Sequence, residues 1–490
     1  MKRLSISNAR KKGDAGSLYA LGFVTIALVV MVLAVRQTAS TAEPSSDLQP
    51  FADPSGEVQT YSTTGTIDES NPFFQDMGTN GRRCVTCHQP SDAWSVTPPH
   101  LRERFEDTEG TDPIFRPVDG ATCPNDDIGT IAERREAYKL LLTKGLIRVG
   151  ISVPSGAEFS VYKVDTPYQD PSKQNICGDP VNLSMYRRPL PSTNLGFLST
   201  VMFDGREFPT LTTAKPFTKQ EILASLRKQA VDATEIHAQG PQPTDDQLAQ
   251  IVAFETSIFT AQSRDRRVGL LHSDGALGGP AELSQQNFFL GINDPLGHNP
   301  SNTSFSPVIF TSYQNWTKAD YDDNEVAEAR RSIARGEDLF NNLSIAIEGV
   351  GGLNDVPLQD GKIHPLIMGS CGTCHDTPGV GDHSFPAPLN IGIADASRRT
   401  PDLPLFTIVC NTTGQFIHTT DPGRALVTGK CTDIGKFKGP ILRGLAARAP
   451  YFHNGMAATL EDVVTFYETR FNFSLTERQE RNLVNFLKAL

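Results

Sequence analysis

The chain has 490 residues, a formal net charge of −11, and 38% hydrophobic residues. This length predicts two or three domains, and this composition is typical of a globular chain rather than a disordered one. Residues 1–42 carry six basic side chains and one acidic side chain, so the remainder has a formal charge of −16. So acidic a body excludes nucleic acid as a partner, because phosphate binding needs a basic surface.

The N-terminus has the organisation of an export signal. A basic segment is followed by an apolar run over 18–35 and by small residues that end at Ala42. The run is also just long enough to span a membrane, so 1–42 is either a cleaved signal peptide or a membrane anchor. Either way, we expect the body of the chain in the periplasm. Residues 43–70 are rich in Ser, Thr and Pro and are expected to form a flexible leader.

Two C-x-x-C-H motifs carry the strongest functional signal. Their residues are Cys84, Cys87 and His88 in the first half, and Cys371, Cys374 and His375 in the second. This is the attachment pattern of c-type haem, in which two thioethers hold the porphyrin and the histidine binds the iron. The alternative is a structural zinc site made from the two cysteine pairs. Export, and the histidine directly after each pair, favour two covalently attached haems.

Four further cysteines are expected to form disulfides. They are Cys123, Cys177, Cys410 and Cys431. An even number in an oxidising compartment favours two structural bridges over reactive thiols. Three pairings are open, and proximity along the chain favours Cys123–Cys177 and Cys410–Cys431.

The two halves of the chain repeat one organisation. Capping boxes at Thr244 and Thr476 each precede an amphipathic helix, and each helix follows a haem motif in the same order. Because strand-type alternation is scarce, we predict a mainly α fold with two tandem cytochrome c-like haem domains and long loop insertions, notably over about 105–185 and 272–330. The expected domains are an N-terminal haem domain over 71–271, a linker or insertion over 272–330, and a C-terminal haem domain over 331–490.

Several segments resemble the bacterial dihaem cytochrome c peroxidase superfamily, including its MauG-like members. The resemblance covers about residues 70–490 and is strongest in the Gly-Pro-Ile-Leu-Arg-Gly-Leu-Ala segment at 439–446 and the Ala-Pro-Tyr-Phe-His-Asn-Gly segment at 449–455. Phe203-Asp204-Gly205-Arg206 is similar to the family's aromatic-Asp-Gly-Arg segment. The resemblance implies an N-terminal haem that reacts with hydrogen peroxide and a C-terminal haem that transfers or stores electrons.

The resemblance also implies a second iron ligand in the C-terminal domain. In such peroxidases a methionine lies fourteen residues after the His of the Tyr-Phe-His-x-Gly segment, and MauG-like enzymes have a tyrosine there. Fourteen residues after His453 is Tyr467. A phenolate ligand stabilises higher iron oxidation states. The alternative is that Tyr467 is a core residue and Met456 is the ligand. The expected iron ligands are therefore His88, His375 and Tyr467.

The peroxide pocket of such enzymes uses a glutamine and an acid after the Asp-Gly-Arg segment. Gln229 lies in a segment similar to the glutamine segment, and the acid is either Glu235 or His237, because the family's position is Gln239 here. A histidine there could transfer protons or bind the iron, and the other alternative is a solvated helix end. His100 is either a haem ligand in one redox state or a loop histidine.

Two further features follow from the resemblance. Phe203 stands where the family has a tryptophan, so a relay of electrons between the haems must differ here. A calcium ion between the haems is typical of the family and would bind backbone carbonyls near Arg448 and Pro450.

Together these features predict an exported dihaem c-type oxidoreductase that reacts with hydrogen peroxide. Its electrons come either from a small cytochrome c or cupredoxin, as in a peroxidase, or from residues of a partner protein, as in MauG-like enzymes. The alternative is a dihaem electron carrier without peroxide chemistry. Dimers are common among such peroxidases, so a homodimer is compatible with the resemblance.

Overall fold

Residues 47–490 form one compact unit. A computed structural model describes residues 49–207, 218–289, 291–294, 299, 301, 303–317, 324–358, 360–379 and 387–490. The predicted export segment, 1–42, lies outside the described residues. Within the described ranges, no helix combines the length and the apolar character that crossing a membrane requires.

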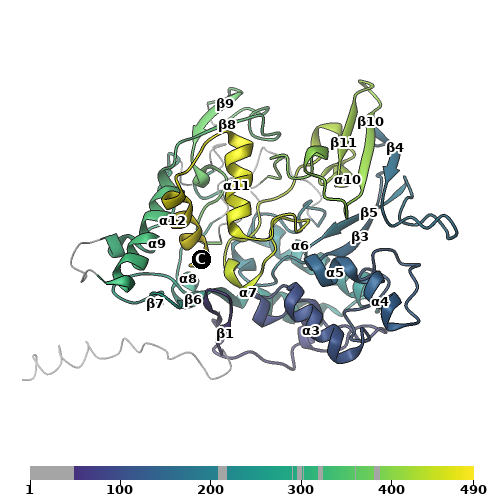
Figure 1. Cartoon of the computed structure of the whole chain (residues 1–490), viewed down its shortest axis with the longest axis horizontal. Helices are drawn as coiled ribbons and strands as arrows, with labels where there is room; N and C mark the ends of the chain where they lie inside the picture. The colour runs from purple at the N-terminus through teal and green to yellow at the C-terminus, as the bar shows by residue number, and fades with distance from the viewer. Residues whose placement is uncertain are drawn as a thin grey trace, which may run out of the picture. The chain divides into compact units, whose positions relative to one another are not determined.

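The second half is built on two helices that cross closely, α9 (Glu325–Asn342) and α12 (Glu477–Lys488) (Figure 1). Thr476 begins α12 with the predicted capping box. A Cβ on Gly336 would lie 2.0 Å from the carbonyl oxygen of Asn482, so only glycine permits this crossing. A third helix, α11 (Leu460–Phe471), contacts α12 and carries Tyr467.

The first half also contains a pair of packed helices, of which the second begins with a capping box. Thr244 caps α7 (Asp245–Ser257), again with the predicted box, and α7 packs against α6 (Lys219–Asp232). Over residues 49–83 the described helical structure is limited to the 3-10 turn η1 (Pro72–Phe74), which contacts α7. The remaining helices are α2 (Cys84–Cys87), α3 (Pro98–Thr108), α4 (Ile131–Ala137), α5 (Lys139–Lys144), α8 (Pro280–Ser284) and α10 (Ala425–Thr428).

The expectation of a mainly α fold is not confirmed, because the described residues also form four β-sheets. Their strand orders are β1-β2-β6-β7, β11-β10-β4, β3-β5 and β8-β9. The strands are β1 (Phe51–Ala52), β2 (Gly56–Ser62), β3 (Ile147–Ser152), β4 (Phe159–Asp165), β5 (Asn182–Arg187), β6 (Ile258–Asp265), β7 (Gly269–Leu270), β8 (Ile345–Glu348), β9 (Leu366–Gly369), β10 (Leu405–Cys410) and β11 (Phe416–Thr419). Most are short and pair with distant segments, so a local sequence pattern indicates them poorly.

The prediction of a flexible leader over 43–70 is wrong for β1 and β2. β2 pairs antiparallel with β6 along its whole length. Its buried face includes Thr60 and Ser62, and the Thr60 hydroxyl lies 2.8 Å from the hydroxyl of Thr260 on β6. The polar composition suggested a loop, but these hydroxyls are buried because each finds a hydrogen-bond partner.

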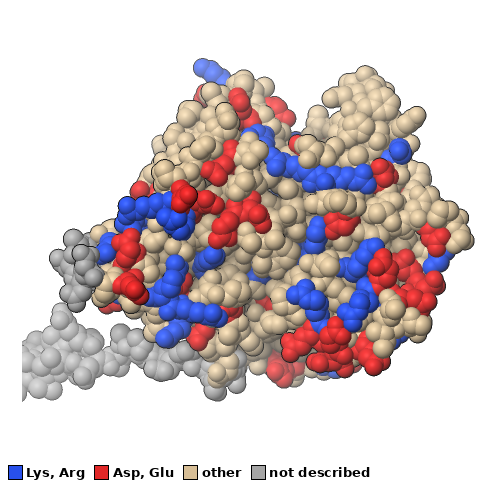
Figure 2. Space-filling model, in the orientation of Figure 1, with Lys and Arg blue, Asp and Glu red and all other residues tan. Residues whose placement is uncertain are grey.

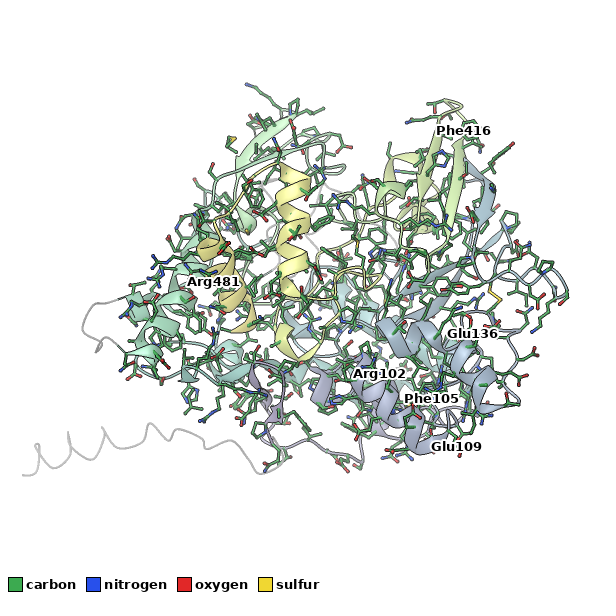
Figure 3. The ribbon with its side chains drawn as sticks, viewed as in Figure 1. Arg102, Phe105, Glu109, Glu136, Phe416 and Arg481 are labelled. Atoms are coloured by element: carbon green, nitrogen blue, oxygen red, sulfur yellow. A yellow bond between two sulfur atoms is a disulfide. The ribbon has the colours of Figure 1, made fainter. Side chains whose placement is uncertain are left out.

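The two expected haem domains are joined by more than a linker. β4, from the predicted loop over 105–185, pairs antiparallel with β10 of the second half. Within 272–330, Phe310, Tyr313 and Trp316 belong to the core that surrounds α9 and α12. Figure 3 shows Phe416 at the outer end of the sheet that contains β10 and β11. The segments that were predicted as loop insertions, 105–185 and 272–330, therefore contribute strands and core residues to the fold.

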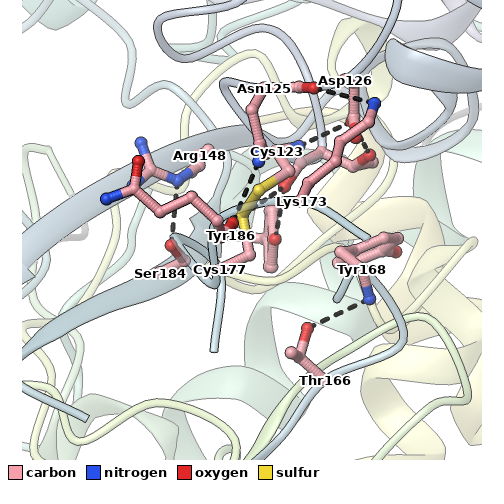
Figure 4. Close-up of a disulfide and its surroundings, with 12 residues drawn as sticks. Cys123, Asn125, Asp126, Arg148, Thr166, Tyr168, Lys173, Cys177, Ser184 and Tyr186 are labelled. Atoms are coloured by element: carbon pink, nitrogen blue, oxygen red, sulfur yellow. Dashed lines mark hydrogen bonds between the residues drawn. A yellow bond between two sulfur atoms is a disulfide. The ribbon is translucent and has the colours of Figure 1, made fainter. Parts of the chain in front are cut away.

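Both disulfides have the pairing that closeness along the chain favoured. Cys123–Cys177 spans a Cα separation of 5.9 Å, and Cys410–Cys431 spans 6.0 Å. Around the first bridge, shown in Figure 4, the backbone N–H of Cys123 donates to Asp126, and the hydroxyl of Tyr186 donates to the carbonyl of Thr122. The bridge therefore joins two segments of the predicted 105–185 loop, and Tyr186 connects β5 to the segment that carries Cys123.

Charge is mixed on the face that Figure 2 shows, where basic and acidic side chains alternate over both halves. Surface ion pairs such as Arg135–Glu106 contribute to this pattern. Exposed pairs of this kind add little to stability, so the core and the sheets carry the fold.

Candidate haem sites

The first site is a cavity whose wall contains Cys84, Cys87 and His88. It encloses about 1420 Å³ of empty space, including the part open to solvent. Both cysteines line it, and they lie at the two ends of the single turn α2. Nδ1 of His88 lies 3.0 Å from the carbonyl oxygen of Trp94. With the Nδ1 proton donated to that oxygen, Nε2 is left to bind a metal.

Burial favours the ligand form of His88. The side chain is partly buried in the cavity wall, and this burial lowers the pKa of His88. A neutral imidazole is the form that binds iron. Among the described side chains, none forms a hydrogen bond with Nε2 of His88.

One face of α6 and of the π-turn that follows it, η4 (Ala233–His237), forms another wall of the first cavity. The lining residues recur at three- and four-residue spacing: Leu226, Gln229, Ala230, Ala233, Thr234, His237 and Ala238. Gln229 and His237 therefore face the same cavity as His88. Glu235 is exposed and does not line it, so the structure does not place this candidate acid at the site.

His237 is held by a buried ion pair. Its Nδ1 lies 2.5 Å from a carboxylate oxygen of Asp119, and Arg82 lies 2.6 Å from the other. Burial opposes ionisation of Asp119, but the hydrogen bond from His237 and the charge of Arg82 outweigh it and lower the pKa of Asp119. The carboxylate is therefore charged, and it fixes one ring nitrogen of His237.

His100 lies outside the first cavity. Its Nδ1 is 2.6 Å from a carboxylate oxygen of Asp92, and neither residue lines the cavity. His100 lies in the first turn of α3, so the structure places it neither at the haem site nor in a loop.

The second site is a cavity around Cys371, Cys374 and His375 with about 1800 Å³ of empty space, solvent-open volume included. Tyr467 enters it from α11, and its hydroxyl lies 3.5 Å from Nε2 of His375. His375 and Tyr467 are the side chains that would hold the iron of a haem in this cavity.

The surroundings of Tyr467 favour the neutral phenol, because burial raises the pKa of Tyr467. Ligation as a phenolate would therefore need the positive charge that a bound ferric iron would supply. Met456 packs beside Tyr467 in an aromatic cluster but does not line the cavity. The structure therefore does not bring the alternative ligand to the site.

The two cysteine pairs lie in different cavities, so they cannot form one four-cysteine zinc site. Burial raises the pKa of the Cys84, Cys371 and Cys374 thiols to about 12, which disfavours metal-binding thiolates. Groups of three or more metal-binding side chains are absent from the part of the chain that the structure describes. The residues present fit two covalently held haems.

Comparison with known proteins gives partial matches, and no family model matches the chain. The chain is 32% identical over 149 residues to cytochrome-c peroxidase IdrP1 of Denitromonas iodatirespirans, covering 26% of this chain and 39% of that protein. It is 33% identical over 129 residues to cytochrome c551 peroxidase of Nitrosomonas europaea, covering 26% and 32%. Each match spans less than half of the relative's length.

Solved structures align over most of the chain but with low similarity. A MauG-like protein associated with microbial copper homeostasis aligns over 86% of this chain and 87% of its own, at 14% identity and a TM-score of 0.32. A variant of the diheme peroxidase BthA from Burkholderia thailandensis covers 91% and 95%, at 14% identity and 0.26. Because these TM-scores are low, the similarity to peroxidases depends on the sequence matches. It is consistent with the two cavities, each of which contains one C-x-x-C-H motif. The chain is therefore similar, over about a quarter of its length, to cytochrome-c peroxidases.

The two candidate haem cavities share one wall. Its residues are Arg188, Pro189, Leu190, Pro191, Phe203, Lys438 and Ile441. Phe203 stands in this wall with its ring centre 6.0 Å from that of His453, which stacks on Phe437 at 4.1 Å. The residue that departs from the family's tryptophan is therefore at the boundary between the two sites.

A buried charge network anchors this wall. Arg187 forms ion pairs with Asp204 at 2.5 Å and with Asp421 at 2.7 Å. Burial opposes ionisation of Asp204, but the charges of Arg187 and Arg206 outweigh it and lower the pKa of Asp204. The Asp-Gly-Arg segment thus holds Phe203 in place and joins the first half to Asp421 of the second.

The calcium site stays a prediction. The carbonyl of Arg448 accepts a hydrogen bond from Arg188 at 3.1 Å, which occupies part of the expected ligand set.

Sequence reasoning missed two acids of the first site. Asp119 lies in a predicted loop, and no local pattern connects it with His237. Glu255 lines the same cavity from α7, and burial raises its pKa to about 8. A signal for Glu255 was present, because it falls seven residues after Leu248 on the apolar face of the helix.

Proposed function

We propose that this protein is a periplasmic dihaem oxidoreductase that reacts with hydrogen peroxide at the N-terminal haem. The proposal depends on one contrast between the sites. At the second site a tyrosine hydroxyl lies beside Nε2 of His375, whereas the first cavity presents Gln229 and His237 and leaves Nε2 of His88 without a hydrogen-bonding side chain among the described residues. A haem with an open position can bind peroxide, and one with two protein ligands exchanges electrons.

The cysteines and histidines of the two motifs would hold the haems. The iron to which peroxide would bind, and the electrons for its reduction, would come from a haem held at the first site. The side chains of the chain would then do the remaining work. Gln229 can donate a hydrogen bond to a peroxide oxygen, and His237 can move a proton between the two oxygens. His375 and Tyr467 would close the second haem to peroxide and stabilise its oxidised states.

Two electron sources are compatible with the site. The names of the relatives support a peroxidase that takes electrons from a small cytochrome c or cupredoxin. The position of Tyr467 supports a MauG-like enzyme that oxidises residues of a partner protein. Phe203 in the shared wall weakens the second alternative, since phenylalanine is harder to oxidise than tryptophan.

The test is stopped-flow optical spectroscopy of the fully oxidised protein with one equivalent of hydrogen peroxide, repeated after one-electron reduction. We expect a high-spin band from one haem and a rapid reaction in at least one of the two states. Reaction of the oxidised protein would support the MauG-like alternative, and reaction only after reduction would support the peroxidase. Two low-spin haems that are inert in both states would contradict the proposal and leave an electron carrier.

The proposal also includes two expected partners, a calcium ion and a second copy of the chain. Metal analysis of the purified protein after chelation, with its sedimentation behaviour, tests both. Loss of peroxide reactivity on calcium removal would support the family-type ion, and unchanged reactivity would exclude a functional role for it.

A further inference from the structure

A buried Arg–Asp–His relay reaches the first haem cavity from outside the haem motif. The side chains of Arg82 and Asp119 are 3% and 5% exposed, and that of His237 is 31% exposed. All three residues line the cavity. Asp119 joins the other two, because Nη1 of Arg82 and Nδ1 of His237 both hydrogen-bond to its Oδ2, at 2.7 Å and 2.5 Å.

We propose that Asp119 is a positioning residue that fixes the tautomer and the orientation of His237 as the proton-transfer group of the first haem site. The inference depends on the proposed peroxide reaction at that site. A carboxylate accepts the proton-bearing nitrogen of a neutral imidazole, so the Nδ1 of His237 is the donor. Nε2 then carries the lone pair, and it is the nitrogen available to a molecule in the cavity.

Arg82 keeps this geometry rigid. Its Nη1 donates to Asp119 at 2.7 Å and to the carbonyl oxygen of His237 at 3.1 Å. Its Nε and Nη2 donate to the carbonyls of Pro113 and Ile114. Arg82 lies two residues before Cys84, so it connects the haem motif with both the loop that carries Asp119 and the end of η4.

The main chain at Asp119 is held as well. The N–H of Arg148 on β3 donates to the carbonyl of Asp119 at 2.6 Å, and the Cys123–Cys177 bridge follows four residues later. Arg148 lies near this bridge in Figure 4. The segment that the sequence indicated as a loop therefore delivers a fixed carboxylate to the cavity.

The proposed step is a proton transfer that leaves His237 unchanged overall. Nε2 takes a proton from one peroxide oxygen and returns it to the other, which departs as water when the O–O bond breaks. The complete reduction consumes two electrons and two protons per peroxide and yields two waters. The electrons come from a reduced small redox protein or from oxidisable residues of a partner protein.

A second pair in the same half provides a matched control. Asp92 and His100 form the same contact, Nδ1 to carboxylate at 2.6 Å, outside the cavity. Asp119→Asn and Asp92→Asn thus make the same chemical change in two Asp–His pairs, of which one faces the haem.

The experiment measures the second-order rate constant of the haem-loaded protein with hydrogen peroxide from pH 5 to 9. We expect Asp119→Asn and His237→Gln each to lower it about 100-fold, in the range of general acid–base catalysis, and to alter its pH profile. Asp92→Asn keeps the wild-type rate and profile. In a His237→Gln background, Asp119→Asn has no further effect, because Asp119 acts through His237.

Other outcomes would overturn the inference. A wild-type rate and pH profile in Asp119→Asn contradicts it, and so does an equal loss with and without His237, which indicates a structural role. If the oxidised first haem is low-spin and becomes high-spin in His237→Gln, His237 is an iron ligand and the inference is wrong. Absence of any peroxide reaction in the wild type instead refutes the proposed function. Haem content and absorption of each variant identify those that fail to fold, and Asp119→Glu then serves as the second variant.

Discussion

The hydroxyl of Tyr467 lies 3.5 Å from Nε2 of His375, although 92 positions separate the two residues in the chain. Tyr467 is placed by α11 and His375 by the C-x-x-C-H turn, and no local element connects them. The relationship therefore depends on the packing of the whole second half. It places Tyr467 beside His375 in the second cavity, whereas Gln229 and His237 line the first.

Replacing Tyr467 by phenylalanine tests this pairing. We expect the second haem to lose its sixth ligand, to gain high-spin character and to rise in reduction potential by on the order of 100 mV, because axial ligands set haem potentials over about 0.8 V. A spectroelectrochemical titration measures this. Tyr451→Phe is the control, since Tyr451 lines the same cavity but its hydroxyl donates to the carbonyl of Leu445. An equal shift in both variants would argue against ligation by Tyr467.

Replacing Phe203 by tryptophan tests the wall between the cavities. An oxidisable ring at this position should accelerate electron exchange between the haems, at a cost of about 1–3 kcal/mol in the free energy of unfolding from overpacking. Flash photolysis of the half-reduced protein measures the exchange rate. Phe197→Trp, at a buried phenylalanine outside both cavities, is the control. An unchanged exchange rate would show that Phe203 is not on the electron path.

Glu255 should make stability depend on pH. Burial raises its pKa to about 8 from 4.5, so the folded state binds this proton more tightly than the unfolded state does. Its stabilising contribution is complete below about pH 4.5 and is lost as the pH rises through about 8, by up to about 1.4 kcal/mol per pH unit. Denaturant unfolding of Glu255→Gln should therefore lack this decline. Glu235→Gln, at an exposed carboxylate, should retain it, and parallel curves for wild type and Glu255→Gln would refute the assignment.

Removal of the Cys123–Cys177 bridge should affect both stability and reactivity. The bridge closes a loop of 54 residues, and loops of this length correspond to about 4 kcal/mol of stabilisation in the chain-entropy model. The double Cys→Ser variant should unfold at lower denaturant and react more slowly with peroxide, because Asp119 loses part of its support. Removal of Cys410–Cys431, which lies far from Asp119 in sequence and closes 21 residues, should cost stability without the same loss of rate. Equal rates of reaction with peroxide in both variants would show that the Cys123–Cys177 bridge does not support the first site.

Local patterns predicted the features that depend on local geometry. The two C-x-x-C-H motifs, the capping boxes at Thr244 and Thr476, and the disulfide pairing were all readable because each depends on spacing or proximity along the chain. The sheets were not, because β2 buries hydroxyls and β4 pairs with β10 more than 200 positions away. Strand pairing over such distances has no local signal.

The choice between Glu235 and His237 as the candidate acid also depended on contacts between distant segments. Both residues were candidates because both lie near the expected position, and helical spacing from Gln229 alone favours His237. The exposure of Glu235 and the contact of His237 with Asp119, 118 positions earlier, follow only from the fold.

The sequence by itself determined that the chain carries two haem attachment motifs, two disulfides and a family resemblance, because covalent chemistry is encoded by neighbouring residues. Only the tertiary structure decided which side chains face each motif, that the cavities share a wall through Phe203, and that a predicted loop supplies Asp119 to the first site. These relationships arise from packing between distant segments, and the free energy of that packing depends on the whole core rather than on any one stretch of sequence.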